Sequence, residues 1–287
     1  MICLTGDIHH ASLRINDQEF IPDAQDTEVK ISRRYLDLLS KYGLKVTFYI
    51  TGKTFSEEWN DVRPIAESPL VEIGGHTYSG LPRPFLTDIT ARLTGRTAVS
   101  HASGHGSYNR QLRDIRSMIG IVRKKTGYTL VSWRSHGLVT DKNTYTILRN
   151  EGIRFISDEL SWSKLSPEPT KESLISHPLN VIMDHDHLYH AHRTEEYVAG
   201  QRKNWAYKDD PTSESYYIDK WADIVEKQVE EIERRGGVAT VLMHPLCMYL
   251  ADNLKTAERL FKFFSRFRTI WARETGAFTI KEAMNEP

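Results

Sequence analysis

Short apolar runs alternate with amphipathic stretches along most of this 287-residue chain. Seven of these runs are partly β-branched and predict strands at residues 2–5, 45–50, 70–73, 129–133, 154–156, 180–183 and 238–243. Residues 28–42, 109–125 and 217–235 instead place apolar side chains at helical spacing, and a glycine follows each stretch within two residues. This alternation predicts a mainly parallel sheet, either closed or doubly wound.

A polar or ionisable residue stands just beyond the end of five predicted strands. These residues are Asp7, His76, Arg134, Asp158 and His244. In a parallel barrel the catalytic groups come from the carboxyl ends of several strands, so the repeated pattern predicts one assembled active site. On that ground we expect the chain to be a hydrolase.

The charge balance limits the partners of the protein. Lysine plus arginine and aspartate plus glutamate both count 38, so the formal net charge is zero and neither nucleic acid nor an anionic membrane is expected as a partner. The first residues offer no basic segment followed by an apolar stretch, so we expect no signal peptide, no membrane anchor and a cytoplasmic location. Cys3 and Cys247 are expected to be buried free thiols.

The length fits one domain over residues 1–287. Two inserted segments, near 81–106 and 184–215, interrupt the repeat and are expected to be lids or substrate walls. The second opens with a histidine-rich stretch, for which a function and a chance enrichment in a solvated loop stay equally open. Its histidines are His185, His187, His190 and His192.

The order of the strand endings resembles that of the polysaccharide deacetylase superfamily, which also includes allantoinase-like amidohydrolases. The resemblance extends from residue 2 to about residue 250 and rests on short motifs that follow the family's order. They are Thr5-Gly6-Asp7-Ile8-His9, Val46-Thr47-Phe48-Tyr49-Ile50-Thr51-Gly52, His76-Thr77-Tyr78-Ser79-Gly80, Arg134-Ser135-His136-Gly137, Asp158 and Leu242-Met243-His244. The resemblance implies an α/β fold in the form of a distorted TIM-like barrel, (β/α)7.

The resemblance also implies roles for four residues. Asp7 acts as the base, Arg134 keeps it ionised and oriented, and His244 is the acid for the departing amine. Asp158 fixes the tautomer of that imidazole and favours its cation. Amide hydrolysis needs an activated water, charge stabilisation on the tetrahedral oxygen and a proton for the leaving nitrogen, and these groups together with a metal supply them.

The metal ligands depart from the family pattern of one carboxylate and two histidines. His9 points to the same face of its strand as the predicted base, so it stands in for the metal carboxylate beside the family histidine His76. Gly80 stands where the second histidine is usual and cannot ligate, so His105 or His101 is expected to supply the third ligand. Such imidazoles suit zinc, nickel or another borderline divalent ion, with zinc as the expected cofactor.

Tyr78, His136 and Trp162 are expected to contact the substrate, with the aromatic rings stacking on a sugar or a cyclic amide. The first interpretation is a metal-assisted hydrolase that cleaves a C–N amide bond and deacetylates an N-acetylated sugar or sugar derivative. Two alternatives stay open: a metal-independent, allantoinase-like hydrolase of cyclic amides, and a catalytically silent carbohydrate-binding relative. The expected partner is a carbohydrate or other small-molecule substrate, and a homo-oligomer is one option for the assembly.

Overall fold

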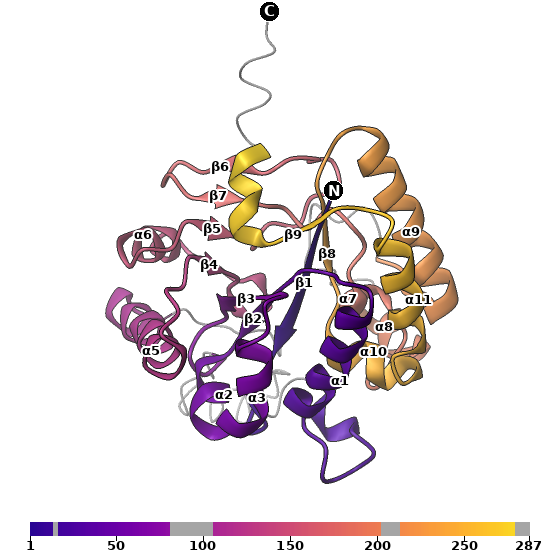
Figure 1. Cartoon of the computed structure of the whole chain (residues 1–287), viewed down its shortest axis with the longest axis horizontal. Helices are drawn as coiled ribbons and strands as arrows, with labels where there is room; N and C mark the ends of the chain where they lie inside the picture. Colours follow the sequence, from indigo (N-terminus) through magenta and orange to yellow (C-terminus); the bar gives the residue numbers. More distant parts are fainter. Residues whose placement is uncertain (14–16, 81–105, 202–212, 279–287) are drawn as a thin grey trace, which may run out of the picture.

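A mainly parallel β-sheet forms the centre of the protein (Figure 1). The computed structural model describes residues 1–13, 17–80, 106–201 and 213–278. The strands are β1 (Ile2–Ile8), β2 (Val46–Ile50), β3 (Val71–Gly75), β4 (Ser132–Trp133), β5 (Phe155–Ile156), β6 (Glu168–Pro169), β7 (Ile175–Ser176), β8 (Ala239–Leu242) and β9 (Thr269–Ile270). Their order within the described residues is β6-β7-β5-β4-β3-β2-β1-β8, with β9 paired to β1, and β6 and β7 pair antiparallel.

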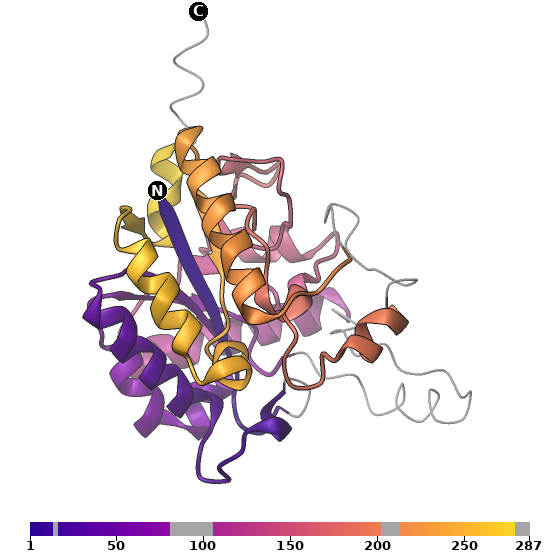
Figure 2. The ribbon, with the colours of Figure 1, turned by 90° about the vertical axis from the view of Figure 1, so that its right-hand side faces the viewer.

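Helices cover the outside of this sheet (Figure 1). They are α1 (Glu28–Lys41), α2 (Gly52–Glu57), α3 (Trp59–Ala66), α5 (Tyr108–Thr126), α6 (Thr144–Asn150), α7 (Asp184–His187), α8 (Glu195–Gln201), α9 (Ile218–Arg234), α10 (Pro245–Asp252) and α11 (Lys255–Phe264), with 3₁₀ turns η1 (Gln18–Phe20), η2 (His136–Leu138) and η4 (Ala272–Phe278). Figure 2 shows α9 and α11 side by side, and α9 also packs on β8. Among the helices of the described residues, none combines the length and the apolar character needed to cross a membrane.

The structure confirms the α/β class and the distorted TIM-like (β/α)7 barrel. Strand β1 pairs with β2, β8 and β9 and is buried along its whole length. Ile2, Leu4 and Ile8 therefore lie in the main hydrophobic core. Asp7 precedes Ile8 and therefore lies at the carboxyl end of this buried strand.

The three helices that the apolar spacing predicts are present as α1, α5 and α9. Thr27 caps α1 because its Oγ1 accepts a hydrogen bond from the backbone N of Lys30 at 3.3 Å. Ser107 caps α5 in the same way, with Arg110 as the donor at 3.4 Å. Gly127, at φ 73°, ends α5 in the left-handed conformation that favours glycine.

Six of the seven expected strands form, whereas residues 180–183 form no strand. Val181, Ile182 and Met183 are buried. A buried segment needs apolar residues whether or not it is a strand, so the apolar run by itself does not identify a strand. The strand prediction for this segment is therefore wrong, although its placement in the core is right.

Asn180 links this segment to the chain around β8 through its side-chain amide. Its Oδ1 accepts from the backbone N of Thr240 at 2.9 Å, and its Nδ2 donates to the carbonyl of Val238 at 3.0 Å and to that of Lys164 at 2.9 Å. The amide thus makes the hydrogen bonds that a neighbouring strand's backbone would make. Because Asn180 is only 2% exposed, water cannot replace these bonds easily.

The two segments expected as insertions are described to different extents. Residues 81–105 of the first lie outside the described residues. The second contains α7 and α8, and its residues 202–212 lie outside the described part of the chain. A single domain over residues 1–287 stays a prediction.

Replacing Asn180 by Leu tests the side-chain link. The change keeps the approximate shape but leaves the Thr240 amide and the Val238 carbonyl without these partners, so we expect a loss of about 2–4 kcal/mol in the free energy of unfolding, measured by urea denaturation. Asn150→Leu, at an exposed position at the end of α6, is the matched control and should change it little. Equal stability of the two variants would show that the amide is dispensable.

Candidate active site

Asp7 and Arg134 form a buried ion pair at the carboxyl ends of β1 and β4. The Nη1 of Arg134 donates to Oδ1 of Asp7 at 2.7 Å, and the guanidinium is 0% exposed. Its Nη2 donates to the hydroxyls of Thr5 at 2.9 Å and Ser157 at 2.7 Å, and its Nε donates to the Ser157 carbonyl at 3.1 Å. The guanidinium carbon also lies 4.3 Å from the centre of the Tyr49 ring. The arginine is therefore fixed from several strands.

The surroundings of Asp7 keep its carboxyl ionised. Burial raises the pKa of Asp7, but the positive charge of Arg134 opposes this, and His76 and His244 act in the same direction as Arg134. The balance holds the pKa well below its usual range. Asp7 is consequently a carboxylate at neutral pH, able to accept a proton.

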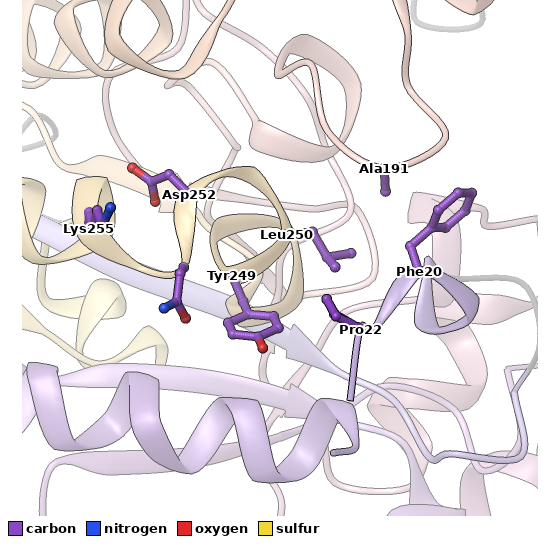
Figure 3. Close-up of a pocket in the computed structure, with 8 residues that line it drawn as sticks. Phe20, Pro22, Ala191, Tyr249, Leu250, Asp252 and Lys255 are labelled. Atoms are coloured by element: carbon purple, nitrogen blue, oxygen red, sulfur yellow. The ribbon is translucent and has the colours of Figure 1, made fainter. Parts of the chain in front are cut away.

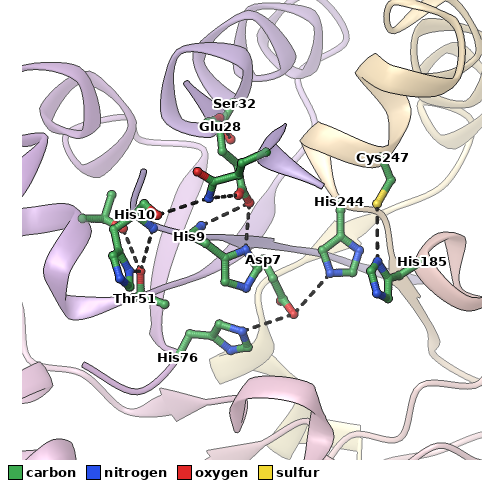
Figure 4. Close-up of polar contacts among 12 residues, drawn as sticks. Asp7, His9, His10, Glu28, Ser32, Thr51, His76, His185, His244 and Cys247 are labelled. Atoms are coloured by element: carbon green, nitrogen blue, oxygen red, sulfur yellow. Dashed lines mark hydrogen bonds and ion pairs between the residues drawn. The ribbon is translucent and has the colours of Figure 1, made fainter. Parts of the chain in front are cut away.

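His244 follows β8 and points its Nε2 at the same carboxylate, 3.6 Å from Oδ2 of Asp7 (Figure 4). Its Nδ1 donates to Oδ1 of Asp184 at 2.7 Å, and its backbone N donates to Oδ2 of Asp184 at 2.5 Å. Burial lowers the pKa of His244, but Asp184 and then Asp7 outweigh it and raise the pKa well above its usual range. His244 is therefore an imidazolium that can donate a proton from Nε2.

The partner of His244 is Asp184, so the expectation that Asp158 orients this imidazole is wrong. Asp158 instead accepts from the backbone N of Ser135 at 2.5 Å, with the Ser135 hydroxyl at 3.4 Å. Burial raises the pKa of Asp158 to about 7. Asp184 follows directly after the apolar run 180–183, so the rule that found the other site residues could also have found it.

Three imidazoles from separate loops lie beside Asp7. The ring centres of His9, His76 and His136 are 5.1 to 5.2 Å apart, and one nitrogen of each lies within 4.8 Å of the others. His9 donates from Nδ1 to Oε1 of Glu28 at 2.9 Å, which leaves its Nε2 unprotonated in the neutral ring. A carboxylate behind an imidazole in this way is the usual support of a metal-binding histidine.

His76 is held in the same manner by the main chain. Its Nδ1 donates to the Arg134 carbonyl at 2.8 Å, so its Nε2 is the unprotonated nitrogen and lies 3.7 Å from Oδ2 of Asp7. The close approach of β3 and β4 makes this bond possible, because a Cβ at Gly75 would lie 2.3 Å from the Trp133 ring. Glycine is required there to bring His76 against the strand that carries Arg134.

The electrostatics and the donor set of this histidine group fit a divalent metal. Burial lowers the pKa of His76 to about 3, and burial followed by the other imidazoles holds the pKa of His136 well below its usual range. Both rings are therefore neutral and offer lone pairs. The buried Nδ1 of His136 has no hydrogen-bond partner within the described residues. A group of three imidazoles suits zinc or another borderline ion.

His136 thus occupies the third position of the imidazole group, for which His105 or His101 was expected. His105 and its alternative His101 lie outside the described residues. Gly80, which occupies the family's second histidine position, has φ 72°, and a Cβ there would lie 2.9 Å from the Leu13 side chain. Space and backbone conformation therefore both favour glycine at position 80, and the imidazole comes from η2.

The other residues expected to touch substrate are half-buried. The backbone N of Tyr78 donates to Oδ2 of Asp114 at 2.8 Å, and its side chain packs against the core. The Trp162 ring lies edge-on to His187 with their centres 6.4 Å apart, and its buried Nε1 has no hydrogen-bond partner within the described residues. Substrate contact by Tyr78 and Trp162 stays a prediction.

The pocket drawn in Figure 3 is separate from this group of catalytic candidates. It has a volume of about 530 Å³ and lies between the turn around η1 and the helices α10 and α11. Its walls include Phe20, Tyr249 and Leu250, and none of the expected site residues lines it. The candidate catalytic residues therefore lie at the strand ends and not in this pocket.

Asp184→Asn tests which carboxylate controls His244. Loss of the negative charge should lower the pKa of His244, which NMR of the histidine ring signals measures across a pH titration. Asp158→Asn is the matched control and should move that pKa much less, because Asp158 contacts Ser135 instead. A larger shift in the Asp158 variant would contradict the assignment.

Part of the chain matches a known protein family, and its fold is similar to that of several solved structures. The sequence profile of the family described as polysaccharide deacetylase matches residues 23–156. A solved structure assigned as a polysaccharide deacetylase from Mycobacterium smegmatis is 14% identical, with a TM-score of 0.65 over 98% of this chain and 90% of that one. No curated protein matches the chain in sequence.

Two further solved structures share the fold. The Puue allantoinase is 11% identical, with a TM-score of 0.63 over 100% of this chain and 91% of that one. A protein of Pseudomonas aeruginosa PAO1 assigned as a polysaccharide deacetylase is 12% identical, with a TM-score of 0.61 over 95% of this chain and 88% of that one. The matched residues 23–156 include His76 and Arg134. The chain resembles the polysaccharide deacetylase superfamily as a divergent member, with a family match over residues 23–156 and a shared fold over nearly the whole chain.

Proposed function

We propose that this protein is a metal-dependent hydrolase that deacetylates an N-acetylated sugar or sugar derivative. The family profile supports the broader class, hydrolysis of carbon–nitrogen bonds other than peptide bonds. The observation that carries the proposal is the position of the Asp7 carboxylate, whose Oδ2 lies 3.7 Å from His76 of the three-imidazole group and 3.6 Å from His244. A base, an acid and a ligand set therefore face one small space.

Asp7 serves as the general base. Its carboxylate is ionised because Arg134 holds its pKa low, and its second oxygen is left to face the imidazoles. From that position it accepts the proton of an attacking water. Arg134 does not touch the reacting atoms, so it is a positioning residue.

His9, His76 and His136 would hold the metal. A divalent ion bound there would supply Lewis-acid activation of the water and of the amide carbonyl. Zinc is the proposed ion, because neutral imidazole ligands suit it and a fourth position can stay open to water. Glu28 and the Arg134 carbonyl hold two of the rings in the required tautomer.

His244 serves as the general acid. Asp184 keeps it protonated and directs its Nε2 towards the site, so the leaving nitrogen can take a proton as the C–N bond breaks. One water is added across that bond, giving a carboxylate and a free amine. The substrate is therefore an amide, which an N-acetylated sugar supplies.

One observation favours a second candidate, a metal-independent hydrolase of cyclic amides. The fold is shared with the Puue allantoinase over nearly the whole of both chains. The three-imidazole group favours the metal-dependent alternative, because three converging imidazoles are not needed for a purely acid–base mechanism. A catalytically silent binding protein is disfavoured by the opposite pKa shifts of Asp7 and His244, which binding alone does not require.

His136→Ala tests the ligand set. In protein purified without a histidine tag, elemental analysis should show a loss of one metal equivalent per chain. His105→Ala is the matched comparison, because the sequence alone favoured that residue, and it should keep the full metal content. The opposite pattern would assign the third ligand to His105.

Asp7→Asn and His244→Gln test the acid and base. Each should lower turnover of an N-acetylated sugar by about 10²- to 10⁴-fold with the fold intact. The wild-type rate should fall in acid as Asp7 protonates below its lowered pKa, and in base as His244 deprotonates above its raised pKa. Asp184→Asn should therefore move the alkaline limb to lower pH.

Wild-type turnover by a folded Asp7→Asn protein would remove Asp7 from the mechanism. Turnover of cyclic amides in place of N-acetylated sugars, retained after metal removal, would select the allantoinase-like alternative. Absence of hydrolysis on both substrate classes would support the binding protein.

A further inference from the structure

A second group of metal-binding side chains lies next to His244. It consists of Asp17, His185, His190 and Cys247, and one candidate ligand atom of each lies within 4.8 Å of the others. Asp17 precedes η1, the two histidines belong to the stretch around α7, and Cys247 is on α10. Figure 4 shows Cys247 and His185 beside His244. Three segments far apart in the sequence thus meet at one point.

The group is enclosed by the protein. Asp17, His190 and Cys247 are 6%, 6% and 3% exposed. Oδ2 of Asp17 lies 3.0 Å from Nε2 of His190, and Sγ of Cys247 lies 3.8 Å from Nδ1 of His185. His192 contacts the other oxygen of Asp17 and is partly exposed.

His190 faces hydrogen-bond acceptors on both of its nitrogens. Its Nδ1 lies 2.8 Å from the Leu188 carbonyl, and its Nε2 faces the Asp17 carboxylate. A neutral imidazole carries a single N–H, so it can donate to one of these oxygens only. A cation is required between Nε2 and Asp17, and it is either a second proton or a metal ion.

The thiol distinguishes between these two cations. A second proton on His190 would account for its contact with Asp17 but gives Cys247 and His185 no reason to meet there. One thiolate, two imidazoles and one carboxylate are a complete set of ligands for tetrahedral zinc. Such an ion, with bonds of about 2.0–2.3 Å, places its ligands about 3.3–3.8 Å apart, so the observed group needs only small side-chain movements.

A second set of candidate ligands shares the cysteine. Asp184, His244 and Cys247 also have candidate ligand atoms within 4.8 Å of one another. Both oxygens of Asp184 accept from His244, so these two residues already pair with each other. The set with Asp17, His185 and His190 offers four side chains instead of three, so it is the one that can close a tetrahedral site.

We propose that Asp17, His185, His190 and Cys247 bind a second divalent cation, with zinc as the expected ion. On binding, the Cys247 thiol gives its proton to solvent and its sulfur bonds to the metal. The four protein ligands close the coordination sphere, so the ion is structural. It ties the segment before η1 and the loop of α7 to α10, and because His185 follows Asp184, it positions the carboxylate that holds His244. None of its four ligands is a residue that the proposed hydrolysis uses.

Cobalt substitution tests this site separately from the three-imidazole group. Only the second site has a sulfur ligand, so cobalt-loaded wild-type protein should show a thiolate-to-cobalt charge-transfer band in the near ultraviolet. The band should persist in His76→Ala, whatever happens to hydrolysis. It should disappear in Cys247→Ser, with a loss of one metal equivalent per chain, and remain in Cys3→Ser, the matched control at the other buried cysteine.

A second variant guards against a folding defect in Cys247→Ser. His190→Gln keeps the thiol and removes one ligand. Loss of an outer-shell partner alone weakens metal binding by about 10- to 100-fold, so loss of this ligand should weaken cobalt binding by at least that factor. Circular dichroism should show folded protein in each case. Absence of the band in wild-type protein, or its persistence in Cys247→Ser, would overturn the proposal.

Discussion

The buried ion pair between Arg134 and Asp7 is the interaction on which both the fold and the site depend. A fully buried guanidinium is tolerated only when its N–H groups are bonded, and here Asp7, Thr5 and Ser157 accept from it. Removing one partner of such a pair typically costs about 3–5 kcal/mol. The pair therefore joins the carboxyl ends of β1, β4 and the chain after β5. The same contact keeps Asp7 ionised, so a structural requirement also prepares the proposed base.

The residues next to Arg134 organise the rest of the site. Its backbone carbonyl fixes the tautomer of His76, and the amide of the following residue, Ser135, is held by Asp158. His136, one residue further, completes the group of three imidazoles. A short segment after β4 thus supplies a charge, a hydrogen-bond acceptor and the third imidazole.

The sequence predicts this arrangement only as far as local pattern reaches. The strand-end rule finds Asp7, Arg134 and His244 because each follows its apolar run directly. It cannot tell which carboxylate meets His244, since Asp158 and Asp184 both follow predicted strands and the choice depends on how the barrel closes. The sequence also does not show how the barrel closes. Residues 180–183 have the apolar pattern of a strand, but the side chain of Asn180 joins them to the β8 region. Tertiary contact, and not propensity, decides these points.

The central claim is that three imidazoles hold a metal ion beside the Asp7 carboxylate. Anomalous diffraction at the zinc absorption edge, from crystals of the zinc-loaded protein, tests it most directly. The account predicts a peak about 2.0–2.1 Å from one nitrogen of each of His9, His76 and His136, with Asp7 facing it. A peak bound by His105 in place of His136, or no peak at this position, would contradict it.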